Sequence, residues 1–411
     1  MSVWLNCLEV YDMAELKDSG TEWLGEIPDS WRLSRIGSVY ELRNTKVSDK
    51  EYPPLSVTNK GIVPQLQTAA KTNAHYDRKL VKKGDFAINS RSDRRGSCGI
   101  SSYEGSVSLI NTILAPLGEM NPRYYDWVFH TVQFGDEFYK WGHGIVDDLW
   151  TTNWQDMKKI TIPMPELDEQ EKIATFLDIK CNEIDELFKD IQEEIDTLEE
   201  YRMSIINKVL MYGISGKSKH KEVRFKYIAT IKSNLVPPTF YLEHPQISPE
   251  NIAKNTGKLL SYSTVEDSGI ISGNHLFYKG QIIYSKIRPN LNKAIIAPFD
   301  GLCSADMYPI EAKINSKYLL YAMLSKHFVE QVTLIMQDRV KMPKINQDEL
   351  GNIVVYIAPD IEQKEIVLYL DKRCVEIDSI IEMKKEQLTV LDEYKKAMIY
   401  EYVTGKKEVY V

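Results

Sequence analysis

Two long stretches of the chain, 165–217 and 358–411, carry apolar residues that recur in alternating steps of four and three. This spacing is the a/d pattern of a coiled-coil helix. The predicted seam of the first stretch consists of Leu177, Ile184, Phe188, Ile191, Ile195 and Leu198. The predicted seam of the second consists of Leu370, Ile377, Ile381, Leu388, Leu391 and Met398.

The two stretches are copies of each other. EQEKIATFLDIKCNEIDEL begins at Glu169, and EQKEIVLYLDKRCVEIDSI begins 193 residues later at Glu362. Solenoid repeats have periods of roughly 20–50 residues, so this offset indicates a duplicated half of a protein. Cys181 and Cys374 fall at equivalent seam positions, which favours a small apolar packing role over a reactive or metal-binding one. Basic residues also fall on the seam, and they either specify register or mark where a partner replaces the neighbouring helix: Arg202, Lys384 and Lys395.

Each copy predicts one helix of about 40 residues, or about 60 Å at 1.5 Å per residue. Asp168 and Asp360 are the expected N-caps, and Gly213 or Gly216 and then Gly405 are the expected stops. Two seams in one chain can pair with each other. We expect antiparallel pairing, because it relates the two copies by an internal two-fold axis and places the two globular segments at opposite ends.

The segments that precede the helices, 18–164 and 218–357, also resemble each other. KGDFAI and KGQIIY each predict a glycine turn that leads into an apolar strand, and Asn121 and Asn315 each open a helical pattern. We therefore predict an α+β fold, with two similar mixed α/β domains joined by two long helices in an internal pseudo-two-fold duplication. Residues 1–17 form an N-terminal extension to which no role is assigned.

The formal net charge of −8 is unevenly distributed. Residues 165–217 contain 14 acidic and 6 basic residues and 359–406 contain 11 and 8, so the rest of the chain holds 34 acidic and 37 basic ones. Two acidic helices therefore separate two mildly basic domains. The chain has no apolar run of membrane-spanning length and no signal-peptide pattern, from which we expect a cytoplasmic protein. Its five cysteines are widely spaced, without a C-x-x-C pair that would indicate a metal site.

After the matched strand, both copies become basic but differ in sequence: NSRSDRRGSCG in the first and SKIRPNLNK in the second. Arginine and asparagine pair bidentately with guanine and adenine edges, and lysine neutralises phosphate. Recurrence at the same place in both copies favours DNA contact over an ordinary solvated loop. The candidate DNA-binding residues are Asn89, Arg91, Arg94, Arg95, Lys286, Arg288, Asn290 and Lys293.

Motifs that would indicate catalysis fail on inspection. GISGKS lacks the glycine that a phosphate-binding loop has five residues before the glycine of its Gly-Lys-Ser, where this chain has Met211. Pro359, Asp360, Glu362 and Lys364 are residue types of a nuclease site, but they are contiguous at a helix start, whereas such carboxylates must converge on a metal. No catalytic residue and no metal ligand is predicted.

Three phrases of the chain resemble a known family. They are KDSGTEWLGEIPDSW at 17–31, IPMPELDEQEKIATFLD at 162–178, and the Ser-Gly-Lys or Thr-Gly-Lys that follows each helix. Together they resemble the specificity subunits of type I restriction-modification enzymes, over nearly the whole chain. The second copy, IVVYIAPDIEQKEIVLYLD, departs from the pattern by having one proline where the first has two.

The resemblance implies a non-catalytic subunit with two target recognition domains, 18–164 and 218–357, each reading one half of a split double-stranded DNA sequence. It implies that the helices form an antiparallel spacer and dock two methyltransferase subunits, with restriction and translocase subunits in the same complex. S-adenosylmethionine, ATP and Mg are then expected in the partner subunits and no cofactor in this chain. Two alternatives remain: a coiled-coil structural adaptor without sequence-specific DNA binding and, least favoured, an enzyme in the globular segments.

Overall fold

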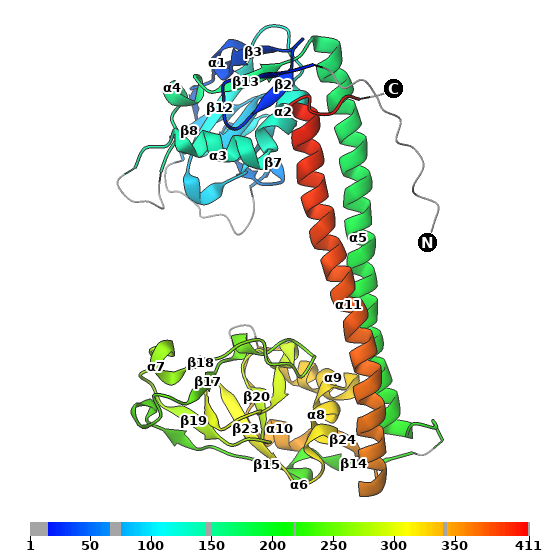
Figure 1. Ribbon diagram of the computed structural model, residues 1–411. Helices are drawn as coiled ribbons and strands as arrows, with labels where there is room; N and C mark the ends of the chain where they lie inside the picture. Colours follow the sequence, from blue (N-terminus) through cyan, green and yellow to red (C-terminus); the bar gives the residue numbers. More distant parts are fainter. Residues whose placement is uncertain (1–14, 66–74, 145–149, 218, 340–342, 410–411) are drawn as a thin grey trace. The chain divides into compact units, whose positions relative to one another are not determined.

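The structure is a computed structural model that describes residues 15–65, 75–144, 150–217, 219–339 and 343–409. The chain forms two compact units. Unit 1 consists of residues 1–189 and 387–411, and unit 2 consists of residues 190–386. The two long helices, α5 (Leu167–Tyr212) and α11 (Asp360–Val403), each contribute one part to each unit (Figure 1).

Unit 1 is a mixed α/β domain around a four-stranded sheet of order β10-β9-β12-β4. A second sheet has the order β11-β8-β5, and three two-stranded ribbons pair β1 with β2, β3 with β13, and β6 with β7. The strands are β1 (Leu16–Asp18), β2 (Glu26–Pro28), β3 (Arg32–Arg35), β4 (Tyr40–Leu42), β5 (Lys46–Val47), β6 (Leu55–Thr58), β7 (Gly61–Pro64), β8 (Arg78–Val81), β9 (Phe86–Asn89), β10 (Cys98–Ile100), β11 (Gly105–Val107), β12 (Asn111–Pro116) and β13 (Thr161–Met164). The short helices are α1 (Ile36–Val39), α2 (Pro122–His130), α3 (Val132–Lys140) and α4 (Trp154–Met157).

Unit 2 has a four-stranded sheet of order β21-β20-β23-β15, a five-stranded sheet of order β16-β19-β22-β17-β18 and a ribbon of β14 with β24. Its strands are β14 (Lys221–Arg224), β15 (Ala229–Ile231), β16 (Leu235–Val236), β17 (Pro245–Ile247), β18 (Ser263–Thr264), β19 (Asn274–Phe277), β20 (Ile282–Ser285), β21 (Ala294–Ile296), β22 (Gly301–Cys303), β23 (Met307–Ala312) and β24 (Val354–Ile357). Its short helices are α6 (Phe225–Ile228), α7 (Val265–Ser268), α8 (Ser316–Leu324), α9 (Lys326–Met336) and α10 (Gln347–Asn352).

The two units share one topology. In each, a short helix follows the ribbon strand, the four-stranded sheet has the same strand order, two consecutive helices follow the sheet, and a one- or two-turn helix precedes the last strand. Asn121 and Asn315 cap α2 and α8, and the glycine turns before β9 and β20 have φ of +89° at Gly84 and +87° at Gly280. The predicted duplicated α+β fold is therefore confirmed. The units differ in the second sheet, where β17 of unit 2 pairs with β22 in parallel.

The long helices begin slightly earlier than the N-caps that the sequence predicts. The carbonyl of Glu166 accepts the backbone N–H of Gln170 at 3.0 Å, and that of Pro359 accepts the N–H of Gln363 at 3.0 Å. Asp168 and Asp360 thus lie in the first turn, and the prediction that they are N-caps is wrong; a carboxylate there still favours the helix through the positive end of its dipole. The prediction that Gly213 and Gly405 end the two helices is confirmed, since they take left-handed φ values of +69° and +72° just past the helix ends.

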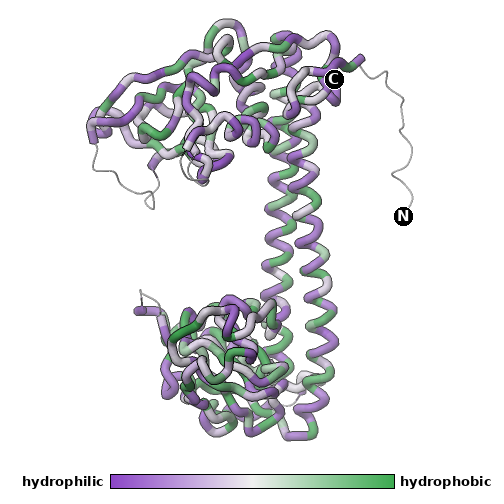
Figure 2. The backbone as a smooth tube through the Cα atoms, turned by 60° about the vertical axis from the view of Figure 1, so that its left-hand side comes forward, coloured by the Kyte–Doolittle hydropathy of each residue, from purple (hydrophilic) through white to green (hydrophobic). Residues whose placement is uncertain are grey.

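The predicted seam is the buried stripe of both helices. All twelve predicted seam residues are buried or partly buried, and along both helices hydrophobic and hydrophilic stretches alternate (Figure 2). Cys181 and Cys374 are buried free thiols, and burial raises the pKa of Cys181 to about 11 and also raises that of Cys374. Both therefore stay protonated near neutrality and fill the seam as small apolar groups.

Within each unit, α5 and α11 run antiparallel, as predicted. In unit 1 the rings of Phe176 and Tyr402 lie 4.4 Å apart, and Lys395 Nζ lies 2.5 Å from Asp185 Oδ1. In unit 2, Glu194 pairs with Lys384, and Arg202 Nε lies 3.0 Å from Asp378 Oδ1. Each of the three basic seam residues thus pairs with an acidic residue of the opposite helix, which supports their role in specifying register.

A repeated glutamine joins each domain to its long helix. In unit 1, Gln170 Oε1 accepts the backbone N–H of Asn121 at 2.9 Å, and Gln170 Nε2 donates to the carbonyl of Pro165 at 2.9 Å. In unit 2, Gln363 Oε1 accepts the N–H of Asn315 at 3.3 Å, and its Nε2 donates to a carbonyl of the same turn at 2.9 Å. Both glutamines are buried. The repeated glutamine therefore forms a structural joint between each domain and its long helix.

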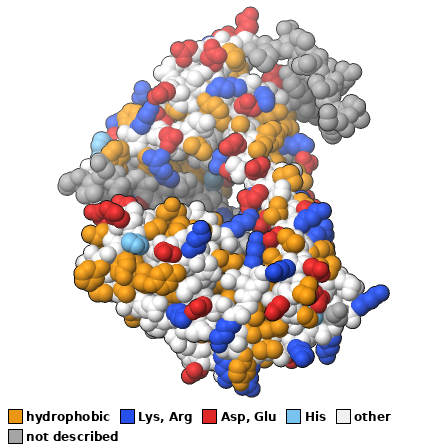
Figure 3. Space-filling view, turned by 60° about the horizontal axis from the view of Figure 1, so that its bottom comes forward, with side chains coloured by type: hydrophobic (Ala, Val, Ile, Leu, Met, Phe, Trp, Pro, Cys, Tyr) orange, Lys and Arg blue, Asp and Glu red, His pale blue; other side chains and the backbone are white. Residues whose placement is uncertain are grey.

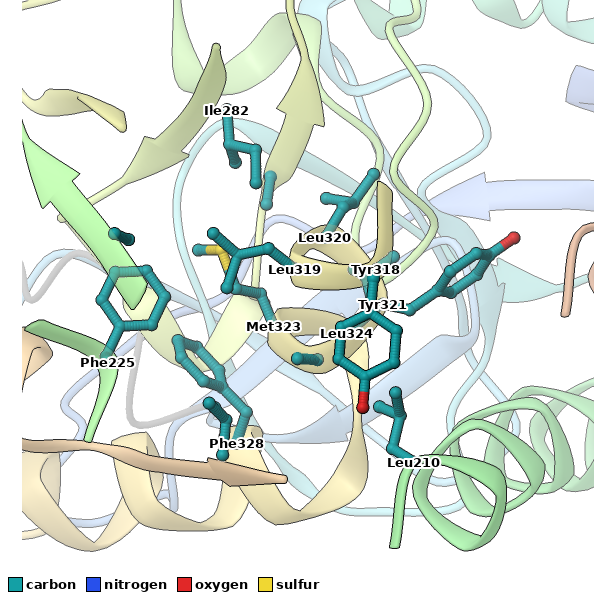
Figure 4. Packing of buried hydrophobic residues seen from close by; sticks show 14 of the residues in the cluster. Leu210, Phe225, Ile282, Tyr318, Leu319, Leu320, Tyr321, Met323, Leu324 and Phe328 are labelled. Carbon is teal, nitrogen blue, oxygen red and sulfur yellow. The ribbon is translucent and has the colours of Figure 1, made fainter. Parts of the chain in front are cut away.

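The core of each unit includes residues of the long helices. In unit 2, Phe225 of α6 and Phe328 of α9 pack with Tyr318 of α8 and Ile282 of β20, and Leu210 of α5 joins the same cluster (Figure 4). In unit 1 the corresponding cluster also contains residues of both α5 and α11. Neither domain therefore closes its core without the helices.

The opening phrase of the chain packs on the end of α11. Tyr400 Oη donates to the carbonyl of Trp23 at 2.9 Å, and Lys406 Nζ donates to that of Leu24 at 2.7 Å. A Cβ on Gly405 would lie 2.5 Å from the ring of Pro28, so only glycine fits there. The opening phrase and the terminal Thr-Gly-Lys, two of the phrases that carry the family resemblance, thus form one contact.

Candidate nucleic-acid interface

The two candidate loops occupy the same place in the two units. Residues 90–97 connect β9 to β10, and residues 286–293 connect β20 to β21. β9 and β20 are each flanked by two neighbours in their four-stranded sheet. A rigid, fully paired strand therefore positions each loop, as is usual for recognition loops on a scaffold.

In unit 1 the arginines of the loop are held by acidic side chains. Arg91 Nε lies 3.1 Å from Asp93 Oδ1, and Arg94 Nε lies 3.8 Å from Asp93 Oδ2. Arg95 Nη1 donates to Asp136 Oδ1 at 2.6 Å. The side chains of Arg94 and Arg95 are 68% and 60% exposed, so their ion pairs contribute little to stability.

Two residues that flank the unit 1 loop, Asn89 and Tyr139, contact its backbone and one of its arginines. Asn89 is buried, and its Oδ1 accepts the backbone N–H of Arg91 at 3.1 Å, so it shapes the loop. Arg95 lies over the ring of Tyr139 at 5.2 Å. Burial raises the pKa of Tyr139 to about 12, with a smaller contribution from Cys98, so the ring beneath the cation is neutral at physiological pH.

In unit 2 the loop is held in an unusual backbone conformation. Arg288 and Asn292 have left-handed φ values of +42° and +44°. The Asn292 side chain is buried and donates to the carbonyl of Met323 at 2.9 Å, which anchors the loop. Arg288 and Asn290 are exposed. Non-glycine residues in this region of φ cost of order 1–3 kcal/mol and concentrate at functional sites.

The two lysines of this loop have different environments. Lys293 Nζ donates to the carbonyl of Pro249 at 2.7 Å and so ties the loop to its neighbour. Lys286 Nζ lies over the ring of Tyr308 at 5.2 Å. Burial, with a further contribution from Lys286, lowers the pKa of His275, so His275 is neutral at pH 7 and leaves the positive charge here to Lys286.

Each loop is hydrogen-bonded to a second segment that the sequence did not indicate. In unit 1 the backbone N–H of Ser92 donates to the carbonyl of Trp150 at 2.9 Å. In unit 2 the N–H of Arg288 donates to the carbonyl of Pro343 at 2.9 Å, and the N–H of Ile345 donates to that of Lys286 at 3.0 Å. The candidate interface of each unit therefore consists of two segments.

A signal for the second segments exists in the chain. Asn153 and Asn346 cap α4 and α10 and lie at the same 193-residue offset as the long helices. Extending the repeat to these caps would have aligned the residues that precede them. In unit 2 these residues add Lys344, whose Nζ lies 2.9 Å from Asp306 Oδ1.

On the face shown in Figure 3, Lys and Arg side chains lie among acidic and hydrophobic ones. Across the described part of the chain, no group of three or more His, Cys, Asp or Glu side chains could hold a metal ion. No helix within those ranges is long and apolar enough to cross a membrane.

Comparison with known proteins finds a similarity to one family. Residues 28–197 match the family model described as type I restriction modification DNA specificity domain. Over 255 residues the chain is 32% identical to the type I restriction enzyme EcoDI specificity subunit of Escherichia coli. The first unit and part of α5 are thus similar to type I specificity subunits. This match covers 55% of the chain and 57% of the relative, so the chain spans little more than half of that subunit's length in the alignment.

Two further comparisons cover almost the whole of this chain. It is 22% identical to the type I restriction enzyme MjaVIII specificity subunit of Methanocaldococcus jannaschii, over 93% of the chain and 94% of the relative. A solved structure of a type I R-M system chain superposes with a TM-score of 0.69 at 14% identity, covering 93% of this chain and 99% of that one. At this identity the superposition supports the fold alone.

Proposed function

We propose that this chain is the non-catalytic subunit that supplies the DNA address of a type I restriction-modification complex. Each unit reads one half of a bipartite double-stranded DNA sequence through its two loop segments. The observation that carries the proposal is the contrast within the repeat. The helices and their joints to the domains are similar in sequence and contacts in both copies, whereas the loops after β9 and β20 occupy the same place but have unrelated sequences.

Base contacts specify sequence, and phosphate contacts position the protein. Arg288 is the strongest candidate for a base contact in unit 2, because its side chain is exposed and its backbone is held in a fixed left-handed conformation. Arg94 is its counterpart in unit 1 as the most exposed arginine of the loop, with a side-chain exposure of 68%. Arg91 and Arg95, whose carboxylate contacts are closer, would act mainly on phosphates.

The long helices would set the gap between the half-sites and dock two methyltransferase subunits. At 46 and 44 residues, α5 and α11 are about 69 and 66 Å long at 1.5 Å per residue. Methyltransferase, restriction and translocase subunits would supply the chemistry, with S-adenosylmethionine, ATP and Mg bound to those partners. The acidic outer faces of the helices suit protein docking better than contact with a phosphate backbone.

A binding experiment separates this proposal from a structural adaptor. The full chain with its methyltransferase partner is mixed with labelled duplexes that contain candidate sequences, and unlabelled competitors are added at a fixed salt concentration. The proposal predicts one preferred bipartite sequence, bound at least about 10³-fold more tightly than random DNA. An adaptor would bind every competitor equally.

A further inference from the structure

Unit 1 contains a cavity between the loop that connects β9 to β10 and the helices α2 and α3. Its volume is about 230 Å³. The wall includes Ile88 of β9, Gly96 of the loop, Phe129 of α2 and Phe134 of α3. Aromatic and aliphatic side chains form most of this wall, which is typical of sites for small organic molecules.

One position of the wall carries a larger side chain in unit 2. Ile88 pairs with Cys98, the first residue of β10. Tyr284 pairs in the same way with Ala294, the first residue of β21, so Ile88 and Tyr284 are equivalent residues of β9 and β20. The Tyr284 ring is fully buried and lies edge to face against the ring of Phe328, with centroids 6.1 Å apart. Unit 1 has an aliphatic side chain where unit 2 has this ring.

The ring that Tyr284 meets in unit 2 has a counterpart in the cavity wall. Thr131 caps α3 by accepting the backbone N–H of Phe134. Ser325 caps α9 by accepting that of Phe328, so Phe134 and Phe328 are equivalent. Phe134 lines the cavity. A flat ring inside the cavity would therefore meet Phe134 as Tyr284 meets Phe328.

A second position of the wall is a glycine where unit 2 has an asparagine. Gly96 and Asn292 each lie two residues before the second strand of their hairpin, and both have a left-handed φ, of +71° and +44°. Beyond its chain neighbours, a Cβ on Gly96 would meet no atom of the described residues within 4 Å. The Asn292 side chain is buried, and its Nδ2 donates to the carbonyl of Met323 at 2.9 Å. Unit 1 therefore has open space where unit 2 has a buried amide.

The carbonyl that receives this amide in unit 2 has a weaker partner in unit 1. Phe129 is the next-to-last residue of α2, as Met323 is of α8. The Cys98 thiol, a weak donor, lies 3.8 Å from the Phe129 carbonyl. Carbonyls of the last helical turn lack a partner within the helix. The Phe129 carbonyl can therefore accept an N–H from a molecule in the cavity.

We propose that the unit 1 cavity binds a small planar aromatic molecule that carries an amide or amino group. The ring of this molecule takes the place that Tyr284 fills in unit 2, and its N–H donates to the Phe129 carbonyl in place of the Asn292 amide. A ligand of about nine non-hydrogen atoms and modest binding efficiency has a Kd of about 0.1–10 mM. Because Arg95 and Gly96 belong to both the wall and the loop, the bound molecule contacts the loop. The inference rests on the comparison of the two units and does not depend on the DNA-reading function.

Titration of the full chain with benzamide, followed by ligand-observed NMR, tests the proposal. Benzamide should bind saturably with a Kd of about 0.1–10 mM. Acetophenone has nearly the same shape but no N–H, so it should bind about tenfold more weakly or worse. The proposal is overturned if benzamide shows no saturable binding up to about 20 mM, or if the two probes bind equally.

Variants that introduce the side chains of unit 2 locate the binding site. Ile88→Tyr/Gly96→Asn should abolish benzamide binding and keep the circular dichroism spectrum, because unit 2 packs the same side chains at these positions. Gly96→Asn alone changes the core less and should weaken binding about tenfold or more. The matched control is Gly84→Asn, at another left-handed glycine of unit 1 with open space around its Cβ, and it should leave binding unchanged. Undiminished binding by folded Gly96→Asn, or an equal loss in Gly84→Asn, would contradict the assignment.

Discussion

Arg202 and Asp378 form a buried ion pair whose repeat counterpart, Lys395 with Asp185, lies at the surface. The side chains of Arg202 and Asp378 are 5% and 12% exposed, whereas those of Lys395 and Asp185 are 21% and 59% exposed. The difference arises from a loop of unit 2. Arg202 Nη1 and Nη2 donate to the carbonyls of Asn255 and Thr256 at 2.7 and 3.2 Å, so this loop covers the pair.

Replacing Arg202 by alanine should destabilise unit 2 far more than replacing Lys395 by alanine destabilises unit 1. Arg202→Ala leaves the Asp378 carboxylate buried, with Lys258 Nζ at 2.8 Å as its remaining ion-pair partner among the described residues, and should cost about 3–5 kcal/mol. Lys395→Ala removes an exposed pair and should cost about 0–1 kcal/mol. Urea denaturation followed by circular dichroism measures both. Equal losses would mean that the loop contributes nothing to the Arg202 pair.

Each repeated glutamine should contribute more to the free energy of unfolding than an exposed glutamine of the same helix does. Gln170→Ala leaves the buried N–H of Asn121 without its acceptor and should lower the free energy of unfolding by about 1–3 kcal/mol. Gln363→Ala does the same to the partly buried N–H of Asn315, and its cost should lie at the lower end of this range. The exposed Gln192 of α5 is the control, and its replacement by alanine should change stability by less than about 0.5 kcal/mol. Loss at only one of the two joints would show that they are not equivalent.

The carboxylate in the unit 1 loop should limit non-specific DNA binding. Asp93→Asn frees Arg91 and Arg94 from their counter-ion, so affinity for random duplex should rise and the slope of log K against log salt should steepen by about 0.9. Fluorescence anisotropy with random DNA at several salt concentrations measures this. The control Glu243→Gln makes the same change in net charge at an exposed position of unit 2. Equal effects of the two variants would attribute the result to net charge alone.

The seam cysteines should resist alkylation in the native protein. Burial raises the pKa of Cys181 to about 11 and also raises that of Cys374, so at pH 8 both thiols are protonated as well as inaccessible. Iodoacetamide at pH 8 should label neither residue within minutes, and both after denaturation in urea, as read by mass spectrometry. The same shift stabilises the folded state below the ordinary thiol pKa, and this stability is lost as pH rises toward 11. Rapid native labelling would place these thiols outside a packed seam.

The parts of the fold that follow from local spacing could be predicted from the sequence. The heptad pattern placed Leu177 and Leu370 in the seam, and the glycine turns placed the strands that carry both loops. Contacts between distant segments could not be predicted, because they depend on tertiary placement. The loop that covers Arg202 lies more than 50 residues away in the chain.

The candidate interface could be predicted only in part, because it too depends on contacts between distant segments. Residue type identified the arginines of the first segments but grouped the buried Asn89 with them, because composition cannot distinguish a side chain that shapes a loop from one that faces solvent. The second segments join the first through backbone hydrogen bonds, which have no signature in side-chain type. The structure places all eight candidate residues in or beside the two loops, and their contacts with DNA remain a prediction.

Mapping methylated adenines across the genome of cells that carry this chain and its partner subunits tests the central claim most directly. The wild-type chain should direct methylation to one sequence made of two fixed halves and a gap of constant length. Arg288→Ala should relax the bases of one half only, at a cost of about 1–3 kcal/mol in discrimination, and leave the other half and the gap unchanged. A continuous recognition sequence, or equal relaxation of both halves, would contradict the account.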